Sequence, residues 1–279
     1  MTRPLARTEI VQVIGDMRRD PASTFHTEDV ARDLGTSPSN FIYAFKQATG
    51  VSPLRFRAAL RIERAKLLLL ATARSVTDVC FEVGYNSVGT FTRTFSAMVG
   101  LAPSRLRELA RERPDGDLSG LPEASFYAPP NEQDATSVEL SVIELGGSTP
   151  IIVAGLFHEA VPAGWPIHGR LALGERSLRL LWPECIGRVS LLVAGLSAPP
   201  KHGFWMPDFD GVSVYAQCLR RNARSRRASV AVEARLRRLR ETDPPVVVAL
   251  PLLITAQSHD RRVTHNPPQH RSFPHVPGY

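Results

Sequence analysis

An internal repeat near the N-terminus constrains the fold of this 279-residue chain more than any other feature. Five residues recur fifty positions further on with their identity unchanged: Ser37, Phe41, Phe45, Gly50 and Pro53 return as Ser87, Phe91, Phe95, Gly100 and Pro103. Upstream of them, Asp29, Val30, Leu34 and Gly35 return as Asp78, Val79, Val83 and Gly84, one residue short of that offset. Self-similarity at a fixed spacing predicts two copies of one structural unit.

Within the first copy the pattern is typical of two helices joined by a tight turn. Residues 28–34 place apolar side chains on one face, and Gly35 can end that helix because it adopts positive φ without a Cβ clash. Ser37 then suits the N-cap of a second helix with proline in its first turn. Phe41 and Phe45, four residues apart, form the apolar stripe of that helix. The copy therefore predicts a helix-turn-helix unit.

The second copy has the same organisation and is separated from the first by one long helix. Ser75 and Asp78 predict a capping box at its start, and Gly84 its turn. Residues 53–70 predict an amphipathic helix that acts as a rigid spacer between the copies. The polar side of the spacer is expected to carry Arg55, Arg57, Arg61, Arg64 and Lys66. Residues 8–19 and 103–113 are expected to add one helix at each end.

The charge of the chain is concentrated in the same region. The net charge is +7, and residues 1–113 carry 17 Lys and Arg against 11 Asp and Glu, whereas residues 114–279 carry 17 against 16. A basic N-terminal part indicates a polyanionic partner. No apolar run approaches the roughly 20 residues of a membrane helix, and no signal-peptide core follows Met1, so we expect a soluble, cytoplasmic protein without a membrane partner. Cys80, Cys185 and Cys218 are too scattered for a disulfide framework or a zinc site.

Beyond residue 113 the composition changes twice. Residues 114–136 are rich in Pro, Gly, Asp and Ser and predict a linker, and residues 258–279 predict a disordered tail. Between them, residues 137–257 contain short Val, Leu and Ile runs bounded by turn residues, which predict an antiparallel β-sandwich, with a helix around 232–240 as the alternative there. The runs are 138–145, 151–157, 178–181, 189–194, 212–217, 230–239 and 246–253.

Seven segments of the first 113 residues form a recognisable set of motifs: Ala31-Arg32-Asp33-Leu34-Gly35-Thr36-Ser37, Phe45-Lys46, Gly50-Val51-Ser52-Pro53, Arg61-Ile62-Glu63-Arg64-Ala65-Lys66-Leu67-Leu68, Val83-Gly84-Tyr85, Phe91-Thr92-Arg93-Thr94-Phe95 and Gly100-Leu101-Ala102-Pro103-Ser104-Arg105-Leu106. Through these motifs the first 113 residues resemble the AraC/XylS family of transcriptional regulators. The resemblance implies a seven-helix DNA-binding domain whose two recognition helices enter successive major grooves of double-stranded DNA. The chain order, with this domain first, is the reverse of the usual one in the family.

Side chains off the two phenylalanine stripes are the candidate DNA contacts. Candidate base-reading residues are Ser39, Asn40, Ile42, Tyr43, Gly89, Thr90, Thr92 and Arg93, and candidate phosphate contacts are Ser37, Lys46, Arg55, Ser87 and Arg105. Arg93 is the favoured base reader because a guanidinium can pair bidentately with guanine O6 and N7; the alternatives are a phosphate contact or a solvated charge. The resemblance is imperfect at Tyr43 and Ser96, where basic residues are common, which favours apolar contact with thymine methyl groups or shape readout in the first unit.

The second domain gives weaker signals. It contains Pro150-Ile151-Ile152-Val153-Ala154-Gly155-Leu156-Phe157, Pro162-Ala163-Gly164-Trp165-Pro166, Gly187-Arg188-Val189-Ser190-Leu191-Leu192-Val193-Ala194 and Asp243-Pro244-Pro245. Through these segments the domain resembles the small prealbumin-like β-sandwiches found as accessory modules. Trp165, Trp182 and Trp205 are candidates for an effector pocket, with a packed core as the alternative. The run 220–227, rich in arginine, could contact flanking DNA or form a solvated loop. No histidine has the spacing of a metal site, so we expect no metal and no cofactor.

Two classes of function remain. The leading hypothesis is a sequence-specific transcription regulator whose second domain senses a ligand, dimerises or contacts another protein, RNA polymerase included. The alternative is an enzyme, such as an alkyltransferase, fused to a DNA-binding module. That enzyme would need an activated thiol beside a histidine, and neither Cys185 nor Cys218 has a histidine next to it in sequence. We therefore expect no catalytic residues.

Overall fold

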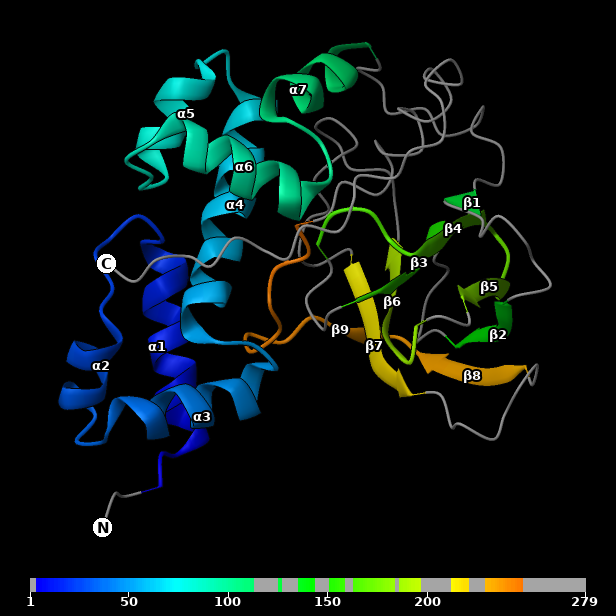
Figure 1. Cartoon of the computed structure of the whole chain (residues 1–279), viewed down its shortest axis with the longest axis horizontal. Coiled ribbons are helices and arrows are strands. Elements are labelled where there is room, and N and C mark those ends of the chain that lie inside the picture. The colour runs from blue at the N-terminus through cyan, green and yellow to red at the C-terminus, as the bar shows by residue number, and fades with distance from the viewer. Residues whose placement is uncertain are drawn as a thin grey trace.

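The computed structural model of the chain describes residues 4–112, 125–126, 135–143, 151–158, 163–183, 186–196, 212–220 and 229–247. Seven helices occupy the N-terminal part, and the strands gather beside them (Figure 1). The helices are α1 (Arg7–Arg19), α2 (Thr27–Asp33), α3 (Pro38–Thr49), α4 (Pro53–Ala71), α5 (Val76–Glu82), α6 (Val88–Val99) and α7 (Pro103–Glu112). The predicted order is confirmed: α2–α3 and α5–α6 are the two helix-turn-helix units, and α4 joins them.

Local sequence signals explain where these helices begin and end. Ser37 and Ser87 are N-caps whose side-chain oxygens accept from the backbone N–H three residues on. Ser75 forms the predicted capping box with Asp78. Gly35 and Gly84 have φ of 63° and 85°, a left-handed conformation that an L side chain rarely adopts. Each unit is therefore specified largely by residues close in sequence.

The C-terminal part consists of two sheets. The strands are β1 (Ser125–Phe126), β2 (Ala135–Ile143), β3 (Ile151–Phe157), β4 (His168–Leu173), β5 (Ser177–Pro183), β6 (Arg188–Leu196), β7 (Val212–Arg220), β8 (Val230–Arg235) and β9 (Arg237–Arg238). One sheet has the order β1-β4-β3-β6-β7-β9 and the other β5-β2-β8. All pairs are antiparallel except β2 with β8. Apolar side chains from both sheets form one buried cluster between them, as a sandwich requires.

Several details differ from the sequence-based expectations. Strands β1 and β4 had no sequence signal, because β1 is very short and β4 contains few apolar residues, and the single run expected over residues 230–239 is divided into β8 and β9. The alternative helix around residue 232 is wrong, since 230–235 is a strand, and residues 246–247 belong to no strand. The predicted tail, Cys185, Trp205, residues 221–227 and most of the predicted linker lie outside the described residues. In the part of the chain that the structure describes, no helix combines the length and the apolar character needed to cross a bilayer.

Strand β3 is buried along its entire length because it is covered on both faces. Since successive side chains of a strand point to opposite faces, Ile152, Ala154 and Leu156 enter the sandwich core. Ile151, Val153 and Phe157 instead join a second cluster, which includes the inward side chains of α4 to α7. The second helix-turn-helix unit and the larger sheet therefore share one hydrophobic core. The first unit has its own core, formed only by residues before α5.

A segment of the C-terminal part also reaches α1 and α4. We call residues 240–247, which follow β9, the strap; in Figure 1 this orange segment runs back to the side of α4. Arg18 donates from Nη2 to the carbonyls of Glu241 at 3.1 Å and Asp243 at 2.9 Å. The Nζ of Lys66 donates to the carbonyl of Val247 at 3.0 Å. The expectation that Lys66 lies on a solvated face is therefore wrong: only 5% of it is exposed, because the strap covers it.

Candidate DNA-binding surface

The candidate reading residues of α3 lie on the side of the helix that faces away from its core. Ser39, Ile42 and Tyr43 are exposed, and the exposed fractions of Ile42 and Tyr43, 39% and 65%, are large for apolar side chains. Asn40 is half-buried and its Nδ2 donates to Thr36 Oγ1 at 2.7 Å, so this amide already has a partner within the unit. The surface offered by α3 is thus mainly apolar and suits thymine methyl groups.

The corresponding face of α6 has a different chemistry. Gly89, Thr90 and Arg93 are exposed, and Thr92 is half-buried. Arg93 stands fifty positions after Tyr43 and so occupies the same place in the second unit. The two helices therefore present an aromatic ring and a guanidinium at equivalent positions. Such a pair can read two different blocks of base pairs.

Buried aromatic rings hold both reading helices against their units. The rings of Phe41 and Phe45 lie 5.8 Å apart edge to face, and Phe56 of α4 packs on Phe45 at 5.5 Å. In the second unit Phe91 and Phe95 are 5.6 Å apart. Because these rings are fully buried, each reading helix is anchored along one side only, and the other side stays open to a partner.

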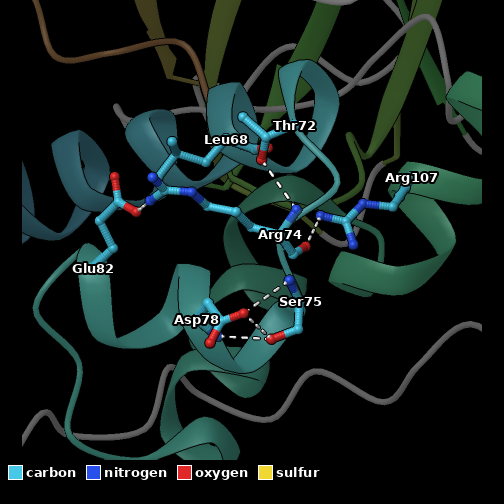
Figure 2. A network of polar contacts seen from close by, with 7 residues as sticks. All are labelled: Leu68, Thr72, Arg74, Ser75, Asp78, Glu82 and Arg107. Atoms are coloured by element: carbon cyan, nitrogen blue, oxygen red, sulfur yellow. Dashed lines mark hydrogen bonds and ion pairs between the residues drawn. The ribbon is translucent and has the colours of Figure 1, made fainter.

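A polar network sets the start of the second unit (Figure 2). The backbone N–H of Arg74 donates to Thr72 Oγ1 at 3.3 Å, and its side chain pairs with Glu82 at the end of α5. Arg107 of α7 donates from Nη2 to the carbonyl of Arg74 at 2.5 Å and from Nε to the carbonyl of Leu69 at 3.0 Å. The turn between α4 and α5 is therefore tied to all three surrounding helices.

In the first unit an equivalent arginine also donates to a backbone carbonyl of the loop that precedes the unit, a contact that the sequence analysis missed. Arg57 lies fifty positions before Arg107 and donates to the carbonyl of Ser23, in the loop that leads into α2. Its guanidinium also lies over the Phe25 ring, 5.8 Å from the centroid. Burial and the neighbouring Arg61 lower the pKa of Arg57 to about 10. The offset of fifty between the two arginines was the available signal, whereas Arg57 had been expected only on the polar side of the spacer helix.

The candidate phosphate contacts differ in how available their charges are. Lys46 is exposed. Arg55 is half-buried, and this burial lowers its pKa. Arg105 donates from Nη1 to Glu108 at 2.7 Å, with Glu112 at 3.5 Å, so its charge is partly compensated within α7. Ser37 and Ser87 use their side-chain oxygens as helix caps, which leaves their hydroxyl protons as donors for a phosphate.

The tryptophans proposed for an effector pocket lie in different parts of the structure. Trp182 is buried in the sandwich core, where its Nε1 donates to the carbonyl of Ile186 at 2.7 Å. Trp165 packs against the core that the larger sheet shares with the second helix-turn-helix unit. Next to it, the N–H of Gly164 donates to the carbonyl of Met98 in α6 at 2.9 Å. Trp165 thus belongs to the contact between the two parts of the chain.

Comparison with known proteins agrees with this geometry. A family model described as a helix-turn-helix domain matches residues 30–109. The arabinose operon regulatory protein of Escherichia coli is 35% identical over 105 residues, which are 38% of this chain and 35% of that protein. The MmsAB operon regulatory protein of Pseudomonas aeruginosa is 33% identical over 100 residues, which are 36% of this chain and 33% of that protein.

The similarity is confined to part of each protein, and the chain spans about a third of the length of the curated relatives that it matches. Among solved structures, a transcriptional regulator from Chromobacterium violaceum with an AraC-type DNA-binding domain is 24% identical. The matched region covers 37% of this chain and 91% of the Chromobacterium violaceum chain, with a TM-score of 0.35. On the family match, residues 30–109 of this chain form a helix-turn-helix domain, and this part of the chain is similar to operon regulatory proteins.

Proposed function

We propose that the protein is a transcription regulator that binds double-stranded DNA sequence-specifically through α3 and α6. The observation that carries the proposal is the pair of reading helices, each capped by a serine, anchored by two buried phenylalanines and open on the opposite face. The charge distribution supports it, because residues 1–113 hold nearly all of the excess positive charge of the chain. The similarity to operon regulators points the same way.

Within this proposal, residues of α3 and α6 that lie off the buried phenylalanine stripes read bases, and three basic residues and the two capping serines hold phosphates. Base contacts are assigned to Ser39, Asn40, Ile42, Tyr43, Gly89, Thr90, Thr92 and Arg93, and phosphate contacts to Ser37, Lys46, Arg55, Ser87 and Arg105. The first unit is proposed to recognise thymine methyl groups through Ile42 and Tyr43, and the second to recognise guanine through Arg93.

Replacement of Arg93 tests the assignment of a base reader. If Arg93 pairs with a guanine edge, Arg93→Ala should cost about 1–3 kcal/mol of binding free energy at the selected site and relax discrimination at one base pair. If it holds a phosphate, binding to all duplexes should weaken alike and the log–log salt slope should fall by about 1. Titrations of selected and base-substituted duplexes at several salt concentrations separate these results, and uniform weakening would remove Arg93 from the base readers.

A fragment test addresses the function as a whole. Residues 1–113 contain both reading helices and α4, so this fragment is expected to enrich a defined sequence from random duplexes. Residues 137–279 contain neither reading helix and should enrich none. Enrichment of no sequence by either the fragment or the full chain would contradict the proposed function, whereas a band shift by residues 137–279 would assign DNA contacts to the arginine-rich run.

The second domain is proposed to regulate the first by sensing a ligand, by forming a homodimer or by contacting another protein such as RNA polymerase. The shared core supports such coupling, since α6 and strands β3 and β6 belong to one hydrophobic cluster. A change in the larger sheet would therefore reach the second reading helix directly. A thermal-shift screen with small metabolites tests the sensing role, because a ligand selective for the folded chain raises the melting temperature.

The alternative of a fused enzyme gains no support from the described cysteines. Cys80 is buried in the shared core and desolvation raises the pKa of its thiol, which is the reverse of an activated nucleophile. Cys218 is exposed on β7, where Arg188 Nε lies 3.0 Å from its Sγ. Among the residues with described positions, no group of three or more His, Cys, Asp or Glu is placed to hold a metal ion.

A further inference from the structure

Arg61 of α4 lies where the two helix-turn-helix units meet. Its Nε donates to the carbonyl of Pro21 at 2.8 Å, and its Nη2 donates to the carbonyl of Ala22 at 3.1 Å. These carbonyls belong to the loop between α1 and α2, in the first unit. The same guanidinium lies over the ring of Tyr85, 5.6 Å from the centroid, and Tyr85 lies between α5 and α6, in the second unit. A single side chain of the connecting helix therefore contacts both units.

The backbones of the two units also approach each other at this point. A Cβ added to Gly84 would lie 2.9 Å from the carbonyl oxygen of Ala22 and 2.8 Å from Arg61 Nη2. The equivalent glycine of the first unit, Gly35, has a similar positive φ but nothing within 4 Å of an added Cβ. Glycine is therefore required at position 84 for two reasons, the positive φ of the turn and the close approach of the Ala22 backbone. At position 35 only the positive φ of the turn requires it.

The repeat shows that this role is specific to Arg61. Arg57 and Arg107 are equivalent positions, and each holds the loop that precedes the first helix of its own unit. Arg111 is the equivalent of Arg61, and it is exposed near the end of α7; among the residues that the structure describes, no further helix-turn-helix unit follows α7. Arg61 is half-buried, and this burial lowers its pKa while Tyr85 and Asp20 act in the opposite direction.

We propose that the junction of Arg61, Ala22 and Gly84 fixes the rotation of the two reading helices relative to each other, and thereby the spacing between the two blocks of base pairs. This inference rests on the proposed DNA-binding function. Helix α4, with 19 residues, sets the length between the units, about 28 Å at 1.5 Å per residue. Each unit packs on α4 through a separate hydrophobic core, and the junction adds a direct polar contact between the two ends, which restricts the rotation of one unit relative to the other about the α4 axis.

Duplexes of altered spacing provide the test. One added base pair shifts a block by about 3.4 Å and rotates it by about 34°. After selection of a two-block site by the full chain, one base pair is added or removed between the blocks. The wild-type chain should lose at least about tenfold in affinity, because one unit can no longer reach its bases. In Arg61→Met, which keeps the aliphatic stem, the loss should fall to about threefold or less.

The quantity to compare is the ratio of the affinity for the selected duplex to the affinity for the duplex of altered spacing. A change in general phosphate affinity affects both duplexes alike and leaves this ratio unchanged. Arg111→Met removes the equivalent arginine and should keep the wild-type ratio. Gly84→Ala should also reduce the ratio, whereas Gly35→Ala, with the same backbone strain but no contact, should keep it. Circular dichroism melts check folding, and Arg61→Lys is a second variant that keeps the charge but loses the two-pronged contact with the loop.

The outcomes distinguish the role of the junction from the proposed DNA-binding function. A folded Arg61→Met or Arg61→Lys chain with the wild-type ratio would overturn the role of the junction. So would a wild-type chain that tolerates one added base pair, a result that needs no variant. Failure of the wild-type chain to select any sequence would instead overturn the proposed function.

Discussion

Phe91→Ala is expected to destabilise the second helix-turn-helix unit and the larger sheet together. Phe91 is completely buried, and removal of such a ring typically costs about 3–5 kcal/mol of unfolding free energy through lost contacts and the remaining cavity. Its cluster contains side chains of α4 to α7 as well as Ile151 and Leu192 of the sheet. Hydrogen exchange followed by mass spectrometry should therefore show faster exchange in α5 to α7 and also in β3 and β6.

Phe41→Ala is the matched control, because Phe41 occupies the equivalent position and is equally buried. Its cluster ends at Leu60, so faster exchange should be confined to the first unit and its contacts with α1 and α4. The loss of unfolding free energy should be similar in size. If Phe91→Ala left exchange in β3 and β6 unchanged, the shared core would not couple the two parts of the chain.

Lys66 is expected to make the stability of the chain depend on pH in the alkaline range. Burial lowers the pKa of Lys66 from 10.5 to about 8 in the folded chain, although Glu63 acts in the opposite direction. Between about pH 8 and 10.5 the unfolded state therefore binds more protons at this residue than the folded state. Stability should rise with pH in this window relative to Lys66→Met, by about 1.4 kcal/mol per pH unit and about 3 kcal/mol in total.

The comparison with Lys66→Met isolates this residue, since Glu63, the charged group that acts on the pKa of Lys66, remains in both proteins. Urea unfolding at several pH values measures the difference. Lys46→Met, which changes an exposed lysine of α3, controls for the loss of a lysine that the strap does not cover. A difference between wild type and Lys66→Met that stays constant over this pH range would mean that the strap does not bury Lys66 in solution.

The two halves of the chain were predictable from sequence to different degrees. In the N-terminal part, caps such as Ser37 and turn glycines such as Gly84 act through neighbours only a few residues away, so composition and spacing suffice to place seven helices. In the C-terminal part, strands β3 and β6 were visible because both are continuous apolar runs. The parallel pairing of β2 with β8 was not, since it joins residues about ninety positions apart.

The candidate reading face followed from the repeat, because side chains off a buried stripe must point outward on a helix. What the sequence could not supply was the set of contacts that orient this face. Arg57 and Arg61 were expected only on the polar side of the spacer helix, and Arg107 had no predicted role, yet each donates to backbone carbonyls more than thirty residues away. The sequence alone does not show whether a long cationic side chain is solvated or donates a hydrogen bond to a backbone carbonyl.

The sequence by itself determined that this chain contains two helix-turn-helix units, where their helices begin and turn, and which helices present exposed faces. Those properties depend on periodicity and capping, which are local. Only the tertiary structure decided that the second unit shares its core with a sheet, that a strap buries Lys66, and that Arg61 joins the two units. Each of these depends on partners brought together by folding, such as Lys66 and Val247, which are 181 positions apart, and no local pattern encodes such a distance.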